Sequence, residues 1–128
     1  MKREILFRGK RSDNSEMVYG NLMDSDSIVG EIVDFDGEYF IPEFWYKVVP
    51  ETVGQFTGLT DKNGTKIFDG DIVRYYDDSE DELTNGVVVF NADFCSFCVA
   101  INGHEDVMLM AHWQYEVVGN IYDKELLA

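Results

Sequence analysis

Closely spaced turn signals constrain the fold of this chain more than any other feature of its sequence. Within residues 51–76, the pairs Asn63-Gly64 and Asp69-Gly70 interrupt short apolar runs. Gly and Asn adopt positive φ angles easily, so each pair predicts a tight reversal of the backbone. Reversals this close together leave room for short strands and exclude a long helix in this part of the chain.

Short apolar runs separated by polar turns continue along the rest of the chain. We expect strands over residues 4–8, 17–22, 28–35, 38–41, 44–49, 52–56, 71–76, 86–90, 94–101 and 115–122. Asp36-Gly37 and Asn85-Gly86 predict hairpin turns, whereas the pattern around Val107 and Leu109 suits either a short helix or a strand. The sequence therefore favours an all-β fold, as a small barrel or a sandwich. The barrel is favoured because the meander over residues 71–101 must protect its edges.

Length and composition point to one domain without a membrane anchor. The chain has 128 residues, 45% of them hydrophobic, which is enough to bury a core, and we expect a single domain over residues 1–128. No apolar run is long enough to span a bilayer, and no apolar segment follows the charged start of the chain. We therefore expect a cytoplasmic protein in which Cys95 and Cys98 stay reduced.

The formal net charge of -15 is the strongest compositional feature. Five of the ten Lys and Arg residues precede Ser12, so the rest of the chain is more acidic still. Binding to a phosphate backbone usually needs Lys or Arg to displace counterions, so direct nucleic-acid binding is disfavoured. The acidic residues either keep the protein soluble or form a surface that a basic partner recognises.

The turn-rich segment and the end of the chain also carry a family resemblance. The sequences VGQFTGL, DKNG and IFDGDIV within residues 52–75, and EVVGNIY at residues 116–122, resemble the YopX family of phage and prophage proteins. The sequences FRGK and MVYG near the start resemble the opening of the same family. This resemblance implies a β-rich fold with an SH3-like barrel component and a phage origin, hence a bacterial host cell. It implies no catalytic or ligand-binding residues, because the family has no established activity.

The turn-rich segment has two interpretations. Its glycines and alternating apolar residues are typical of a fold signature, in which turns and close backbone contacts need residues without a Cβ. Alternatively, residues 57–71 form an exposed loop that presents four polar side chains to a partner. These candidate partner-binding residues are Asp61, Lys62, Asn63 and Asp69.

A crowded aromatic segment is a second candidate surface. Residues 39–46 include five aromatic residues, and neighbouring residues of a strand face opposite sides of a sheet. Some of these rings are therefore expected outside the core, unless the strand is buried on both sides. We take Phe44, Trp45 and Tyr46 as candidates for contact with a partner or with a second copy of the chain.

Residues with catalytic or metal-binding chemistry do not form a recognisable motif. Cys95 and Cys98 have C-x-x-C spacing, but they are expected on opposite faces of one strand, and the spacing of His104 and His112 does not match a zinc finger. The acidic run over residues 77–82 lacks the ligand spacing of an EF-hand. We expect no metal, no cofactor and no enzymatic activity.

The sequence therefore predicts a phage-derived, non-enzymatic module that works by protein contact or self-association. One alternative is a DNA mimic, in which carboxylates take the place of phosphates and occupy a DNA-binding protein of the host. Another is an unrecognised hydrolase with carboxylates or histidines gathered in a pocket.

Overall fold

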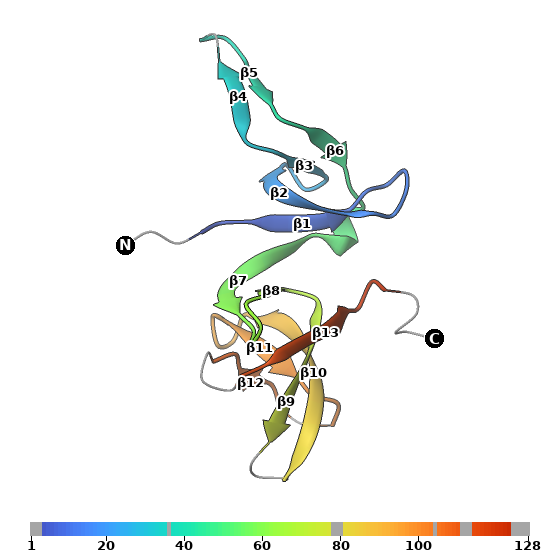
Figure 1. Cartoon of the computed structure of the whole chain (residues 1–128), viewed down its shortest axis with the longest axis vertical. Helices are drawn as coiled ribbons and strands as arrows, with labels where there is room; N and C mark the ends of the chain where they lie inside the picture. The colour runs from blue at the N-terminus through green and yellow to red at the C-terminus, as the bar shows by residue number, and fades with distance from the viewer. Residues whose placement is uncertain (1–3, 36, 78–80, 104, 111–113, 124–128) are drawn as a thin grey trace. The chain divides into compact units, whose positions relative to one another are not determined.

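The structure is a computed structural model that describes residues 4–35, 37–77, 81–103, 105–110 and 114–123 (Figure 1). The predicted all-β class is confirmed, and the described part of the chain contains one short 3-10 helix, η1, at Pro50–Thr52. The contacts of the chain fall into two compact units, Met1–Phe56 and Thr57–Ala128. The single domain and the SH3-like barrel stay predictions.

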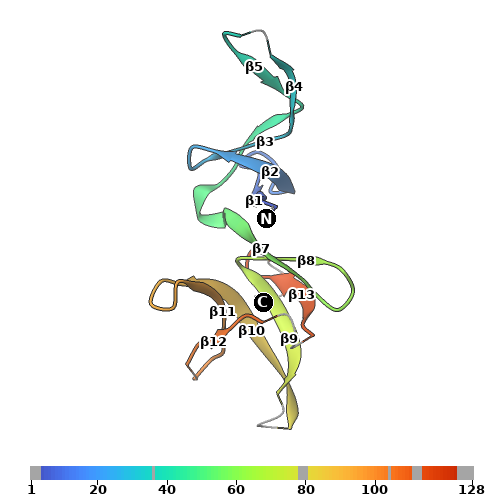
Figure 2. The ribbon, with the colours of Figure 1, turned by 90° about the vertical axis from the view of Figure 1, so that its left-hand side faces the viewer.

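The first unit is built on a curled antiparallel sheet. Its strands are β1 (Phe7–Lys10), β2 (Met17–Met23), β3 (Ser27–Val29) and β6 (Trp45–Lys47), in the spatial order β6-β3-β2-β1. Beyond β1 the sheet continues with the first residues of β7 (Gly54–Thr60). The sheet curls toward itself, since Arg11 after β1 forms a bridge with Val48 after β6. Strands β4 (Ile32–Phe35) and β5 (Phe40–Pro42) form a separate antiparallel pair (Figure 2).

The strand predicted over residues 28–35 is interrupted at Gly30, and this prediction was wrong. The Gly30 N–H donates a hydrogen bond to the Phe44 carbonyl oxygen at 2.9 Å. A Cβ on Gly30 would lie 2.7 Å from the Phe44 ring, so only glycine permits this approach. The close contact with Phe44 ends β3 and lets β4 turn away into the hairpin. The predicted hairpin is present, although Asp36 of its turn lies outside the described residues.

The second unit contains a five-stranded antiparallel sheet. Its strands are β9 (Asp71–Asp77), β10 (Glu82–Asn91), β11 (Ser96–Ala100), β12 (Val107–Met108) and β13 (Glu116–Asn120), in the spatial order β12-β11-β10-β9-β13. The remainder of β7 pairs with β8 (Lys66–Phe68). One face of the sheet carries the core, which is formed by Ile67, Val73, Tyr75, Val88, Val99 and Tyr115. The predicted meander is confirmed, and the ambiguous residues near Val107 form a strand.

The Asn85-Gly86 pair does not form a turn, contrary to prediction. Both residues lie inside β10, where Asn85 pairs with Arg74 and Gly86 with Val73. A Cβ on Gly86 would overlap the Val99 side chain of the neighbouring strand. Glycine is needed here for close packing and not for a reversal of the chain, and the two requirements look the same in a sequence.

Candidate functional site

The first site feature is the turn between β7 and β8. The Gly64 N–H donates to the Asp61 carbonyl oxygen at 3.0 Å, and Gly64 has a φ of 85°. The Asp61 N–H in turn donates to the Thr65 carbonyl oxygen at 2.8 Å. These hydrogen bonds and the positive φ of Gly64 confirm the tight reversal predicted from Asn63-Gly64. Glycine suits this position because it adopts such a φ without strain.

The Asp61 side chain ties this turn to β13. Asp61 is only 7% exposed, and its Oδ1 accepts hydrogen bonds at 2.9 Å from the N–H groups of Asn63 and Thr65. Its Oδ2 accepts a third hydrogen bond from the Val117 N–H at 3.0 Å. The Lys62 N–H donates to the Tyr115 carbonyl oxygen at 2.9 Å. The turn thereby covers part of the outer edge of β13, where no other strand among the described residues pairs with it.

These hydrogen bonds also set the ionisation of Asp61. Burial by itself raises the pKa of a carboxyl group, but the N–H groups of Val117, Thr65 and Asn63 donate to the charged form and lower it. The hydrogen bonds prevail, and the pKa of Asp61 lies below its ordinary value of 3.8. Asp61 is therefore a buried carboxylate that accepts hydrogen bonds from the backbone of its own turn and of β13.

The four candidate residues of this segment are thus placed differently. Lys62 and Asn63 are exposed, Asp69 is half-buried, and Asp61 is buried. The segment does not present all four side chains together as the loop hypothesis expected. Contact with a partner stays a prediction for Lys62, Asn63 and Asp69.

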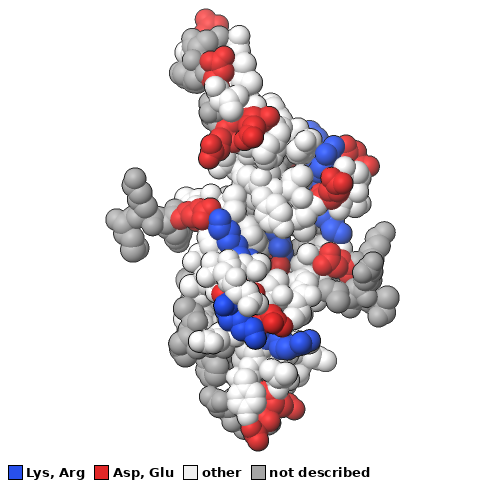
Figure 3. All heavy atoms as spheres, in the orientation of Figure 1, with Lys and Arg blue, Asp and Glu red and all other residues white. Residues whose placement is uncertain are grey.

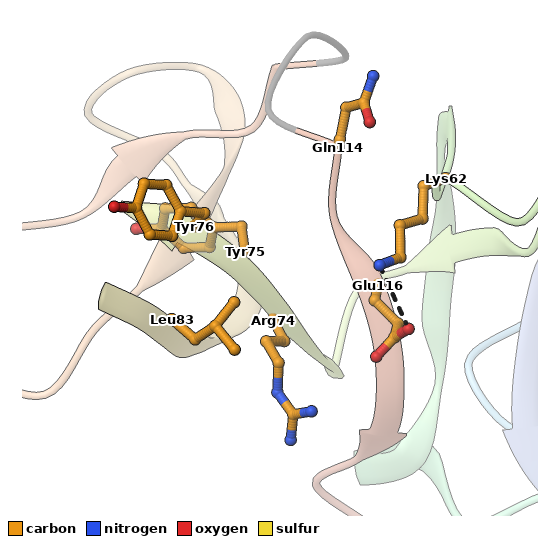
Figure 4. Close-up of a pocket in the computed structure, with 7 residues that line it drawn as sticks. All are labelled: Lys62, Arg74, Tyr75, Tyr76, Leu83, Gln114 and Glu116. Atoms are coloured by element: carbon orange, nitrogen blue, oxygen red, sulfur yellow. Dashed lines mark ion pairs between the residues drawn. The ribbon is translucent and has the colours of Figure 1, made fainter. Parts of the chain in front are cut away.

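A pocket of about 240 Å³ lies beside Lys62 in the second unit (Figure 4). We call it the Arg74 pocket, after one of the residues that line it. Its lining residues are Lys62, Arg74, Tyr75, Tyr76, Leu83, Gln114 and Glu116. They come from the β7–β8 turn, from β9 and β10, and from β13 together with the residue two positions before it.

Strand pairing places the polar residues of the Arg74 pocket. Arg74 on β9 is paired with Glu116 on β13 and with Asn85 on β10, so the three side chains form a row across one face of the sheet. Arg74 Nε donates to Asn85 Oδ1 at 3.2 Å. Glu116 Oε2 lies 3.6 Å from Lys62 Nζ. Each charged group of the pocket is therefore positioned by a neighbour from another element.

Two exposed residues contribute apolar area to the lining of the Arg74 pocket. Tyr76 and Leu83 are cross-strand partners and remain 46% and 66% exposed. The Tyr76 hydroxyl donates a hydrogen bond to the Asp81 carboxylate, which holds the outer end of the ring. Gln114, on another side, has a φ of 54°, a left-handed conformation that costs a residue with a side chain roughly 1 kcal/mol.

The aromatic segment of the first unit is arranged around β6. Trp45 is 55% exposed, whereas Phe44 and Tyr46 are half-buried. The Phe44 and Tyr46 rings stack with their centroids 5.4 Å apart, and the Arg11 guanidinium carbon lies 4.0 Å from the Tyr46 ring centroid. We call Phe44, Trp45 and Tyr46 the Trp45 surface. The expectation that some of these rings lie outside the core is met by Trp45.

The turn after β7 and the strand β13 both lie in the region that a protein-family model matches. A model of the family described as YopX protein matches residues 6–128. The chain belongs to the YopX family. The YopX sequences DKNG and EVVGNIY, which lie far apart along the chain, contain the two partners of the Asp61–Val117 hydrogen bond. Two of the sequences that resemble the family therefore meet in the fold.

A fold of the same extent is known from a crystal structure. Protein EF1440 from Enterococcus faecalis is similar over 98% of this chain and 99% of its own length, with a TM-score of 0.66 and 21% sequence identity. At this identity the likeness concerns the fold alone. No curated protein matches the sequence. Within the described residues, no helix is long and apolar enough to cross a membrane.

The cysteines of this YopX chain are placed differently from the prediction. Cys95 is not in a strand; it lies in the turn between β10 and β11 with a φ of 51° and is exposed. Cys98 lies in β11 and is fully buried. In the part of the chain that is described, His, Cys, Asp and Glu side chains do not gather in groups of three or more that could hold a metal ion. His104 and His112 lie outside the described residues.

Sequence reasoning missed most of the Arg74 pocket. Only Lys62 was a candidate, and Arg74, Tyr76, Gln114 and Glu116 were not. One signal was available: Arg74 and Tyr76 alternate with the apolar Val73 and Tyr75, which marks an outer strand face that carries an isolated cation. The pairing of Arg74 with Glu116 and of Tyr76 with Leu83 could not be predicted from neighbouring residues in the sequence.

Proposed function

We propose that this chain is a non-enzymatic protein-interaction module of prophage origin, which acts in the cytoplasm of a bacterial host and binds its partner through the Trp45 surface. The observation that carries the proposal is the exposure of Trp45 on β6, which lies at the edge of its sheet. An exposed tryptophan among other aromatic rings is typical of the centre of a protein interface.

The Trp45 surface is also held in place before a partner binds. The Tyr46 ring contacts both the Phe44 ring and the Arg11 guanidinium. Arg11 is oriented by Asp13, whose Oδ2 lies 2.6 Å from Arg11 Nη2. Rings that are already ordered lose little conformational entropy on association, which favours binding. Phe44 also lines a cavity of about 400 Å³ next to Gly30, so the surface is not flat.

The test is recovery of a partner from host-cell lysate by three tagged proteins: the wild type, Trp45→Ala and Phe94→Ala. Phe94 is a matched control, because it is a similarly exposed aromatic residue in the other unit. We expect Phe94→Ala to recover the same protein as the wild type and Trp45→Ala to lose it, with equal melting temperatures. Sedimentation of the purified wild type shows whether the partner is a second copy. Equal recovery by all three proteins would overturn the proposal.

The DNA-mimic alternative is separated by elution in rising salt. Interactions between exposed charges are screened by salt, whereas contacts through buried aromatic area are not. We expect the partner to stay bound at high salt. Early release of a basic DNA-binding protein, unaffected by Trp45→Ala, would favour the mimic.

A further inference from the structure

We propose that the Arg74 pocket is a second binding site, which takes one carboxylate side chain of a partner protein together with an apolar side chain next to it. That the ligand belongs to a protein rests on the proposed function, in which this chain acts by protein contact. It concerns residues of the second unit only, so it can fail while binding through Trp45 stands.

Charge is the first argument. Residues 57–128 contain four Lys and Arg residues but fourteen Asp and Glu residues, and two of those four cations line this one pocket. The single carboxylate in the lining, Glu116, is paired with Lys62. Figure 3 shows basic groups lying beside acidic ones on one face of the molecule. The lining thus carries two cations and one carboxylate on an acidic protein, and this net positive charge suits an anion.

The geometry of Arg74 favours a carboxylate. The hydrogen bond from Nε to Asn85 fixes the plane of the guanidinium. A guanidinium carries five N–H donors in a planar fork, so Arg74 can also donate to both oxygens of a carboxylate through its terminal nitrogens. Such bidentate pairs are among the stronger hydrogen bonds that proteins form.

Size and polarity define the rest of the ligand. A volume of about 240 Å³ lies below the roughly 300–1,000 Å³ of most pockets for small molecules and cofactors. It suits one or two side chains of a peptide. Tyr76 and Leu83 offer exposed apolar area beside Arg74. An acidic residue followed by an aromatic residue matches both parts of the lining.

A polyanion such as nucleic acid fits less well. The net charge of -15 repels an extended row of phosphates, each of which would need its own cation. A single carboxylate feels mainly the charges within roughly 8 Å, because salt screens those farther away. The pocket should therefore bind a single carboxylate in preference to phosphate groups, and the test includes phosphate-bearing probes for comparison.

The test uses capped dipeptides as probes. We expect N-acetyl-Asp-Phe-amide to shift the NMR signals of Arg74, Tyr76 and Leu83 in the folded full chain, and the uncharged N-acetyl-Asn-Phe-amide to shift them much less. Arg74→Gln should weaken binding about tenfold, which corresponds to about 1.4 kcal/mol. Lys66→Gln is the matched control, since it removes one exposed cation of the same unit that does not line the pocket.

Several results would contradict binding of a carboxylate in the Arg74 pocket. Equal binding of both dipeptides, no effect of Arg74→Gln, or no shifts at all would overturn the proposal. So would stronger shifts of the same signals by inorganic phosphate or an oligothymidylate. If Arg74→Gln did not fold, Leu83→Ala should weaken binding of the Asp-Phe probe through the apolar part of the site. Trp45→Ala should bind the probe normally, which separates this test from that of the proposed function.

Discussion

The Asp61 carboxylate accepts a hydrogen bond from the Val117 N–H at 3.0 Å, although the two residues are 56 positions apart in the sequence. The same carboxylate holds its own turn through Asn63 and Thr65. Asp61 thus joins a local reversal to the edge strand of the sheet.

Removing the Asp61 carboxylate should destabilise the fold. Asp61→Ala leaves three partly buried backbone N–H groups without their acceptor, and we expect a loss of roughly 2–4 kcal/mol in the free energy of unfolding. Urea unfolding measures it. Asn63→Ala, at an exposed position of the same turn, should cost less than about 0.5 kcal/mol. Equal, small effects of both variants would contradict the role assigned to Asp61. Lys62→Ala is therefore the better variant for testing partner contact by this turn.

Stability should depend on pH through Asp61. Because the pKa of Asp61 is lower in the folded chain than its ordinary value of 3.8, the contribution of the carboxylate is complete above that value. It is lost as the pH falls from about 4 through the lower folded pKa. We expect the difference in unfolding free energy between the wild type and Asp61→Asn to be larger at pH 7 than at pH 3. A difference that does not change with pH would refute this assignment.

Gly86 should not tolerate a larger residue. The Cβ of Gly86→Ala would overlap the Val99 side chain and approach the Ala100 carbonyl oxygen to 3.1 Å. Overpacking of this kind costs about 1–3 kcal/mol. Thr84→Ala on the same strand should cost less than about 1 kcal/mol. Thermal melting of both variants tests this, and an unchanged melting temperature for Gly86→Ala would mean that β10 and β11 are not packed this closely.

The two thiols should react at different rates. Cys95 is exposed in its turn, whereas burial, with a further contribution from Asp106, raises the pKa of the Cys98 thiol. The thiolate is the reactive form, so a thiol reagent should modify Cys95 quickly and Cys98 slowly in the folded chain. Cys95→Ser should abolish the fast phase. Two fast phases of equal size in the wild type would show that Cys98 is accessible.

Much of the fold follows from local sequence patterns. The reversal at Asn63-Gly64 and the hairpin between β4 and β5 were predicted, because the φ preference of glycine acts within a few residues. The continuous strand over residues 28–35, which contains Gly30, and the turn at Asn85-Gly86 were predicted wrongly for the opposite reason. Each of the two positions is glycine because a side chain from elsewhere in the sequence, Phe44 or Val99, occupies the place of its Cβ.

The candidate sites divide in the same way. Residues 44–46 could be identified as a surface from their own order, since adjacent strand residues face opposite sides. The Arg74 pocket could not, because its lining combines strands whose pairing depends on contacts between residues far apart in the chain.

The sequence by itself determined the β class, the main reversals and the family, all of which depend on neighbouring residues or on a continuous motif. Only the tertiary structure decided that Asp61 is buried against Val117 and that Arg74 lies between Glu116 and Asn85. The physical reason is that strand register is set by packing of the whole sheet, and a shift of one residue would turn each side chain to the other face.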